Sequence, residues 1–462
     1  PDTLVRYEGQ NVTFKLTTAN GAAVPNVSVT FTANSSFNNL PTTVQTNTGG
    51  EFTVSGLMAL TAGSQSVEVT VDGQKVNATL TVNEATYNLT ATPDTLVRYE
   101  GQNVTFKLTT SGGAAVPNTS VTFTANANFN SLPQSTQTNA GGEFTVSGLT
   151  ALTAGSQSVE VTVNGQKVNA TLAVNEATYN LTATPDTLVR YEGQNVTFKL
   201  TTSGGAAVPN KSVAFTGNSA LELSTSTETT NANGEITIPN LRSMDLQPKT
   251  VQASVDGQTL SVQLTVSQGG FNLEANPTAL LQHEQQNVTF TIKTDNGTPI
   301  PNASVTFANT TNFTGLPGTT TTDANGQIRD VSLTAIESGT QTVQVTMDGQ
   351  TESVEFAVTP ATYQLSTSDT LQQWEVAKSV TFTLMTGNNT PVPDAKVSYT
   401  ISNLGGADIA NTTQTGNDGT FTVNGVATKL STAANVTVTV DGKQATTTIT
   451  VTSASYSLTT TD

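Results

Sequence analysis

The side chains best suited to chemistry in this sequence are asparagines that stand two residues before a serine or threonine. Nineteen of the 41 asparagines meet the pattern Asn-x-Ser/Thr with x other than proline, whereas 92 threonines and 35 serines would give roughly eleven by chance. This pattern is the acceptor for N-linked glycans. The predicted glycosylation sites are Asn11, Asn77, Asn88, Asn103, Asn169, Asn180, Asn195, Asn287, Asn302 and Asn435.

The same asparagines have a second explanation that needs no glycan. Residues i and i+2 of a β-strand face the same side, so an outward Asn followed by an outward Thr produces the pattern automatically. That geometry also places the Asn side chain in solvent, where a glycan can be accommodated. Both explanations stay open, and both require strands.

Catalytic chemistry has few residues available. The chain has one histidine and no cysteine, which excludes thiol nucleophiles, thiolate metal sites and disulfides. No Gly-rich phosphate loop, His-carboxylate metal spacing or EF-hand loop occurs in the sequence. We predict no catalytic residue, no metal site and no cofactor, and therefore that the chain is not an enzyme.

The charge balance argues against two classes of partner. With 17 basic and 34 acidic residues, the formal net charge of −17 repels phosphate backbones and anionic lipid headgroups. No apolar run reaches the roughly 18 residues of a membrane-spanning helix. We expect no nucleic-acid partner and no membrane insertion in this segment.

The elements that position these residues repeat along the chain. The string TPDTLVRYEGQNVTFKLTT begins at Thr92 and again at Thr184, and all but its first residue opens the chain at Pro1. A turn proline keeps the same interval of 92 residues at Pro25, Pro117, Pro209, Pro301 and Pro393. The sequence therefore predicts five copies, of which the fifth carries a one-residue insertion before Gly419.

The single histidine takes a repeated ring position. His283 stands where other copies have Tyr7, Tyr99 and Tyr191. We interpret it as a partly buried ring that replaces another ring, rather than as a general base.

Within one copy the hydrophobic period is two. In the segment 103–109 the apolar Val104, Phe106 and Leu108 alternate with polar residues, which is typical of a strand with one face on a core. The pair Asn164-Gly165, which is Asp-Gly in the other copies, is a strong hairpin signal. About seven such strands in some 90 residues predict an all-β tandem array of five immunoglobulin-like Greek-key β-sandwiches.

The repeat sets the predicted domain boundaries. The five predicted immunoglobulin-like domains are residues 1–86, 87–178, 179–270, 271–362 and 363–455. The first copy lacks the segment Tyr-Asn-Leu-Thr-Ala-Thr that precedes Pro93 and Pro185, and residues 456–462 repeat that segment at the other end. Two explanations stay open: these residues belong to a longer array, or a strand with Tyr456, Leu458 and Thr460 completes the first domain of a neighbouring molecule.

The order of motifs within one copy resembles a known repeat. The motifs are G-x-x-VPN-x-SVTFT, then T-x-x-x-G-x-F/I-T-V, then L-T-A-x-x-x-G-x-Q-x-V-x-V-T-V-D/N-G-Q. They resemble the bacterial Ig-like repeat of invasin- and intimin-type surface proteins over essentially the whole chain, most closely within 289–360. The resemblance implies a stalk, a spacer or an adhesin, without a common active site.

The expected function depends on the length of the array and not on a catalysed reaction. Five units of about 40 Å make a rod of roughly 200 Å. We expect a non-catalytic structural segment of an extracellular fibre, stalk or surface layer on a prokaryotic cell, with further identical repeats, self-association or glycans as partners. The alternative is an adhesin that binds a host protein or glycan through its sheet faces or loops.

Overall fold

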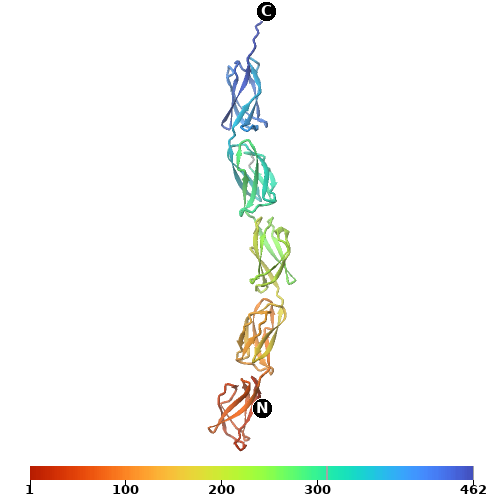
Figure 1. Cartoon of the computed structure of the whole chain (residues 1–462), viewed down its shortest axis with the longest axis vertical. Coiled ribbons are helices and arrows are strands. Elements are labelled where there is room, and N and C mark those ends of the chain that lie inside the picture. The colour runs from red at the N-terminus through yellow and green to blue at the C-terminus, as the bar shows by residue number, and fades with distance from the viewer. Residues whose placement is uncertain (309–310, 461–462) are drawn as a thin grey trace.

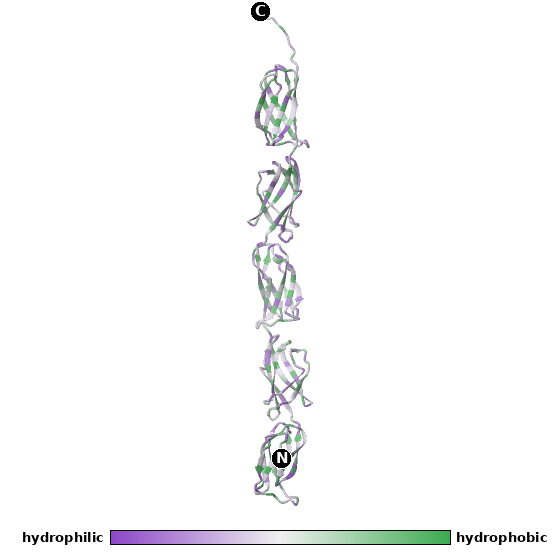
Figure 2. Cartoon of the chain, turned by 90° about the vertical axis from the view of Figure 1, so that its left-hand side faces the viewer, coloured by the Kyte–Doolittle hydropathy of each residue, from purple (hydrophilic) through white to green (hydrophobic). Residues whose placement is uncertain are grey.

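The computed structural model describes residues 1–308 and 311–460 as a line of five β-sandwiches (Figure 1). Within these ranges the only helix is a three-residue 3-10 turn, η1 (Ser219–Leu221). Apolar side chains form the buried core of each sandwich. Hydrophobic and hydrophilic residues alternate along the strands (Figure 2). The predicted all-β array of immunoglobulin-like sandwiches is confirmed.

Forty-two strands build the ten sheets of the described residues. The first sandwich contains β1 (Thr3–Val5), β2 (Gly9–Lys15), β3 (Ser28–Phe31), β4 (Phe37–Asn38), β5 (Thr43–Gln45), β6 (Glu51–Ala59), β7 (Gly63–Val71) and β8 (Gln74–Asn83). The second contains β9 (Tyr87–Thr92), β10 (Thr95–Val97), β11 (Gly101–Thr110), β12 (Ser120–Phe123), β13 (Phe129–Asn130), β14 (Ser135–Gln137), β15 (Glu143–Ala151), β16 (Gly155–Val163) and β17 (Gln166–Asn175).

The remaining three sandwiches repeat this order. The third contains β18 (Tyr179–Thr184), β19 (Thr187–Val189), β20 (Gln194–Thr202), β21 (Ser212–Phe215), β22 (Ser226–Thr229), β23 (Glu235–Leu241), β24 (Lys249–Val255) and β25 (Gln258–Ser267). The fourth contains β26 (Phe271–Asn276), β27 (Ala279–Leu281), β28 (Gln285–Thr294), β29 (Ser304–Ala308), β30 (Phe313–Thr314), β31 (Thr319–Thr321), β32 (Gln327–Ala335), β33 (Gly339–Met347) and β34 (Gln350–Thr359). The fifth contains β35 (Tyr363–Ser366), β36 (Thr370–Gln372), β37 (Lys378–Thr386), β38 (Lys396–Ser402), β39 (Ile409–Gln414), β40 (Thr420–Val426), β41 (Ala434–Val440) and β42 (Lys443–Thr452).

The second sandwich shows how the two sheets are connected. One sheet has the order β13-β15-β11-β9 and the other the order β10-β17-β16-β12-β14. The opening strand is split between them: β9 pairs antiparallel with β11, and β10 pairs parallel with the last strand, β17. This split and the very short β13 and β14 give nine strands where alternation predicts about seven, because segments of two or three residues are too short to show a period.

The core follows the period of two. Val104, Phe106 and Leu108 of β11 are fully buried. The Phe106 ring stacks on Phe144 at 5.4 Å between centroids, and Phe123 meets Phe144 edge-on at 5.8 Å. Aromatic pairs of this geometry add about 1 kcal/mol beyond their buried area.

Two turn positions require glycine or a residue that tolerates positive φ. Asn164 and Gly165 have φ values of 47° and 80°, which joins β16 to β17 through the two-residue turn that the sequence predicts. Gly142 has a φ of 77°, and a Cβ there would lie 2.5 Å from the carbonyl oxygen of Leu108. The backbone of β11 therefore leaves no room for a side chain at position 142.

A buried threonine fixes the proline turn in every copy. The Thr138 hydroxyl donates to the Val116 carbonyl at 2.7 Å and accepts from the Thr119 N–H at 2.9 Å. The equivalent threonines make the same two kinds of bond in the other four copies; they are Thr46, Thr230, Thr322 and Thr415. All five are buried, so each hydroxyl satisfies backbone groups that water does not reach.

Candidate functional site at the domain junctions

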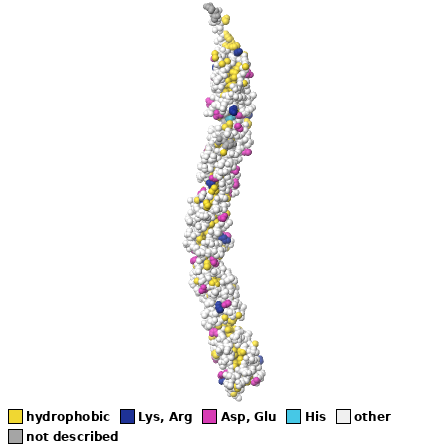
Figure 3. Space-filling model, turned by 180° about the vertical axis from the view of Figure 1, so that it is seen from behind, with side chains coloured by type: hydrophobic (Ala, Val, Ile, Leu, Met, Phe, Trp, Pro, Cys, Tyr) yellow, Lys and Arg dark blue, Asp and Glu magenta, His cyan; other side chains and the backbone are white. Residues whose placement is uncertain are grey.

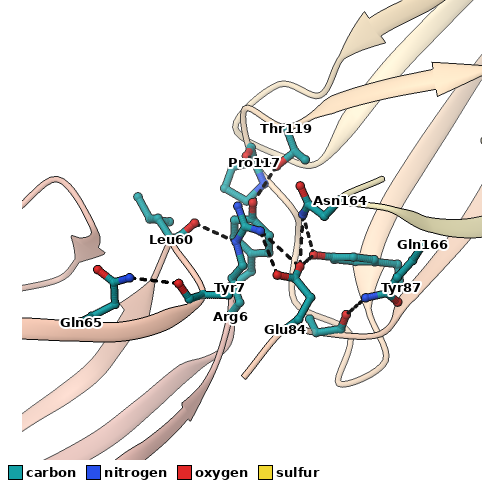
Figure 4. A network of polar contacts seen from close by, with 12 residues as sticks. Arg6, Tyr7, Leu60, Gln65, Glu84, Tyr87, Pro117, Thr119, Asn164 and Gln166 are labelled. Atoms are coloured by element: carbon teal, nitrogen blue, oxygen red, sulfur yellow. Dashed lines mark hydrogen bonds and ion pairs between the residues drawn. The ribbon is translucent and has the colours of Figure 1, made fainter. Parts of the chain in front are cut away.

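The first junction is built around a tyrosine that leaves its own domain. Tyr7 follows β1 in a tight turn with a φ of 65°, and its N–H donates to the Ala59 carbonyl. Its ring belongs to the apolar core cluster of the second domain, where only 3% of the residue is exposed. The phenol lies 3.0 Å from the Thr119 hydroxyl of that domain (Figure 4).

A polar network surrounds this tyrosine. Arg6 lies over the Tyr7 ring at 4.6 Å, and its guanidinium pairs with the Glu84 carboxylate at 3.1 Å. Asn164, in the β16–β17 turn of the next domain, donates to Glu84 at 3.2 Å and to the Tyr87 hydroxyl at 2.8 Å. Burial, and then the hydrogen bond to Glu84, raises the pKa of Tyr87, so the phenol stays protonated and remains a donor. The junction thus joins both domains and the linker between them.

The second and third junctions repeat the arrangement with an ion pair across the gap. Arg98 reaches Asp256 at 3.5 Å, and Arg190 pairs with Asp348, each acid lying in the equivalent hairpin turn of the next domain. Tyr99 and Tyr191 enter the core clusters of the third and fourth domains. Three successive junctions therefore combine an apolar anchor with a basic side chain.

Asp256 shows how an acidic side chain at a junction stays ionised although it is partly buried. Burial alone would raise its pKa, but the Lys211 ammonium at 2.5 Å and the Tyr179 hydroxyl at 2.9 Å outweigh burial, and the pKa of Asp256 is lowered. The carboxylate therefore stays ionised at neutral pH.

The fourth junction has different side chains. Gln282 and His283 stand where the other copies have Arg and Tyr. His283 is buried, with its ring 6.1 Å from that of Tyr363, so it lies where our interpretation as a replacement ring places it. Its Nε2 is 3.3 Å from the Asp441 carboxylate.

The first domain has an open sheet edge. Its sheet β2-β6-β4 has no counterpart of β9, which covers β11 in the second domain. A groove of about 530 Å³ lies at this edge, lined by Val12, Phe14, Leu16, Val67, Val69 and Leu80 among others. Phe14 and Leu16 are only partly buried, whereas their equivalents Phe106 and Leu108 are fully buried under β9.

The predicted inter-subunit strand projects from the other end of the rod (Figure 1). Tyr456 and Leu458 are 77% and 101% exposed, and Thr460 is also exposed. Residues 456–460 form no strand, and 461–462 lie outside the described residues.

The ten predicted glycosylation sites are all exposed; nine lie in strands, where alternation places them outward, and Asn302 lies in a turn. Three of them also have a structural role at a β-bulge: the side-chain oxygens of Asn11, Asn103 and Asn195 accept the backbone N–H of Gly56, Gly148 and Asn240. Asn287 accepts the Ser332 hydroxyl at 3.1 Å. Exposure suits a glycan, and the bulge contacts give these asparagines a role that does not depend on one.

Among residues 1–308 and 311–460, no group of three or more His, Cys, Asp or Glu side chains is placed to hold a metal ion. Within the same part of the chain, no helix has the length and apolarity to cross a bilayer. The surface carries scattered acids, with Lys and Arg concentrated at a few points (Figure 3).

Reasoning from the sequence missed the junction network. Arg6, Arg98 and Arg190 recur at the repeat interval, and so does the turn that supplies Asn164, Asp256 and Asp348. That common interval was the available signal. It does not reveal that the turn of one copy meets the arginine of the copy before it.

The fold and the repeat define the chain as a tandem array of immunoglobulin-like domains, the class of the bacterial repeat that its motifs resemble. No protein-family profile and no curated protein matches the sequence. Among solved structures the chain is similar to a tetra-tandem repeat in the extending region of a large adhesion protein, with 19% identity over 79% of this chain and 99% of that chain and a TM-score of 0.28.

Two further solved structures are adhesion proteins. Invasin, a bacterial integrin-binding protein, is 17% identical over 81% of this chain and 80% of its own, with a TM-score of 0.27. The adhesin InvE of Yersinia pseudotuberculosis is 20% identical over 47% of this chain and 70% of its own, also with a TM-score of 0.27. At these values the likeness concerns the fold and carries no argument about function.

Proposed function

We propose that the chain is a non-catalytic spacer within an extracellular fibre, stalk or surface layer of a prokaryotic cell, built from the five domains bounded at 86/87, 178/179, 270/271 and 362/363. The observation that carries the proposal is the repeated junction. Tyr7, Tyr99 and Tyr191 each enter the core of the following domain, which fixes neighbours end to end. Such a rod would hold the part of the fibre, stalk or surface layer at its far end away from the cell.

The strand pairing suits a rod under tension. In each domain the strand near the entry point pairs in parallel with the last strand, as β10 does with β17. Pulling on the ends loads these hydrogen bonds together, along the strands, instead of opening them one at a time. We expect single-molecule stretching to show up to five equal unfolding steps, each releasing about 92 residues.

Two measurements test the spacer role. Small-angle scattering should give an extended particle of roughly 200 Å, and antibodies against the chain should label intact native cells. A compact particle, or label found only inside the cells, would overturn the proposal. Capture of a specific host protein or glycan by the isolated chain would favour the adhesin alternative.

We also propose that copies join head to tail by strand addition. The groove on the first domain has the lining that β9 covers in the second domain, and the segment 456–460 has the alternation of β9. The register of β9 on β11 would place Leu458 of a second copy opposite Leu16, and Thr460 opposite Phe14.

Light scattering on the full chain tests strand addition. We expect oligomers that dissociate in the Leu458→Asp variant. Adding Tyr-Asn-Leu-Thr-Ala-Thr before Pro1 should have the same effect, because the groove is then filled within one molecule. Oligomers that persist in both variants would exclude strand addition, and a monomeric parent chain would favour the longer array, in which a preceding segment fills the groove.

Glycosylation remains part of the proposal. The ten asparagines lie in solvent, where a transferase has access. In mass spectrometry of proteolytic peptides from the native organism, peptides that contain these asparagines should be heavier than their bare sequences. Peptides with only the bare masses would reject N-glycosylation.

A further inference from the structure

The fourth junction lacks the apolar anchor of the other three. The core clusters of the second, third and fourth domains each include a tyrosine from the preceding domain. The cluster of the fifth domain includes none of the described residues that precede Tyr363. The buried ring at the fourth junction is instead the imidazole of His283, which packs near the Tyr363 ring and also makes a polar contact with the fifth domain.

One carboxylate collects polar contacts at this junction. A single oxygen of Asp441 accepts from Gln282 at 2.7 Å and from the Tyr363 hydroxyl at 2.6 Å, and it lies 3.3 Å from Nε2 of His283. Gln282 carries no charge, and burial together with the bond to Asp441 raises the pKa of Tyr363, so the phenol stays neutral. His283 is the side chain of this group that can acquire a positive charge.

Two other charged groups at the junction, Glu284 and Lys443, have hydrogen-bond partners there. Glu284, which follows His283, accepts the hydroxyls of Thr386 and Thr390 from the fifth domain. Lys443 of β42 donates to the Ala361 carbonyl of the linker at 3.0 Å. Histidine is the residue type whose charge changes closest to neutral pH.

We propose that the fourth junction is a pH-sensitive joint in an otherwise fixed rod. Protonated His283 forms an ion pair with Asp441 and holds the fourth and fifth domains together. Loss of the proton removes that charge and frees the joint to bend, while the Glu284 contacts keep the domains adjacent. The second and third junctions have an arginine in place of Gln282, and a guanidinium group does not lose its proton in proteins, so these junctions do not respond.

This inference rests on the proposed function, because a joint matters only in a chain that works as a rod. Asp441 is 42% exposed at its side chain, so the ion pair is partly screened. We expect the ratio of docked to bent molecules to fall roughly two- to fivefold between pH 5.5 and pH 8.

Spin-label distances across two junctions of the full chain test the joint. The chain has no cysteine, so introduced cysteines are the only labelling sites. Ser353→Cys with Thr446→Cys spans the fourth junction, and Asn169→Cys with Ser261→Cys spans the second at equivalent positions; all four residues are exposed. The first pair should give a narrow distance distribution at pH 5.5 and a broad one at pH 8, whereas the second pair should stay narrow at both.

Variants at the ring position separate the outcomes. His283→Tyr, which restores the residue of the earlier copies, should abolish the pH response, and Asp441→Asn should abolish it as well. An equal width at both pH values in the parent chain, or a pH response that survives in His283→Tyr, would overturn the joint. A broad distribution for the second pair at both pH values would instead refute the rod itself.

Discussion

Replacing Thr138 by valine should unfold one domain of the array well before the other four. The side chain is 2% exposed, and its hydroxyl bonds the Val116 carbonyl at 2.7 Å and the Thr119 N–H at 2.9 Å. Valine has the same shape without the hydroxyl. Both backbone groups would then stay buried without a partner, at about 1 to 3 kcal/mol each.

The extra methyl group offsets part of this loss, by about 1 kcal/mol. The net destabilisation of the second domain is therefore about 1 to 5 kcal/mol. A domain of this size shifts its melting temperature by about 4 to 8 °C per kcal/mol, so the expected decrease lies between about 4 and 40 °C.

Differential scanning calorimetry on the full chain measures the effect directly. About one fifth of the total unfolding enthalpy should move to lower temperature in Thr138→Val, since one of five similar domains is affected. Thr138→Ser is the matched control, because it keeps the hydroxyl and should shift the transition by only a few degrees. An unshifted Thr138→Val profile, or a Thr138→Ser profile shifted as far, would refute the reasoning.

Three further predictions concern a turn, a bulge and a junction. Gly142→Ala should destabilise the second domain by more than about 2 kcal/mol, because the new Cβ would meet the Leu108 carbonyl. Gly113 has a similar positive φ with open space around it, so Gly113→Ala should destabilise the domain by only about 1 kcal/mol. Equal melting temperatures of the two variants in calorimetry would contradict this. Asn103→Ala and Thr105→Ala should both remove the glycan expected at Asn103 in mass spectrometry. Asn103→Ala should also lower stability by about 1 kcal/mol, because it deletes the bond to the Gly148 N–H, whereas Thr105→Ala deletes only an exposed hydroxyl pair with Thr145 and should lower stability less. Because the pKa of Asp256 is lowered in the folded chain, its contribution to stability is present above the ordinary value of 3.8 and is lost as the pH falls through the folded value. The melting temperature of the third domain should therefore drop below about pH 4, and a drop of equal size in Asp256→Asn would exclude this assignment.

Much of the fold could be predicted from local patterns. Alternation in 103–109 predicts β11, and Asn164-Gly165 predicts the β16–β17 turn, because strand faces and turn geometry depend on residues two to four positions apart. The repeat interval supplies the number of copies for the same reason. The exposure of nine of the ten asparagines follows from the same alternation, and that of Asn302 from its place in a turn.

The junctions could not be predicted in this way. Arg98 and Asp256 are 158 positions apart, and Tyr7 and Thr119 are 112 apart. A sequence pattern records that such residues recur, but it does not say which copies meet.

The sequence by itself determined the strands, the turns and the count of five, since short-range sterics and burial on one face dictate them. Only the tertiary structure decided that Tyr7, Tyr99 and Tyr191 enter the core of the next domain. The same holds for the hydrogen bonds of Thr138 to the buried backbone of the proline turn, and for the contact between His283 and Asp441. Contacts between domains depend on how whole sandwiches pack at their poles. The geometry of those poles exists only after each domain has folded.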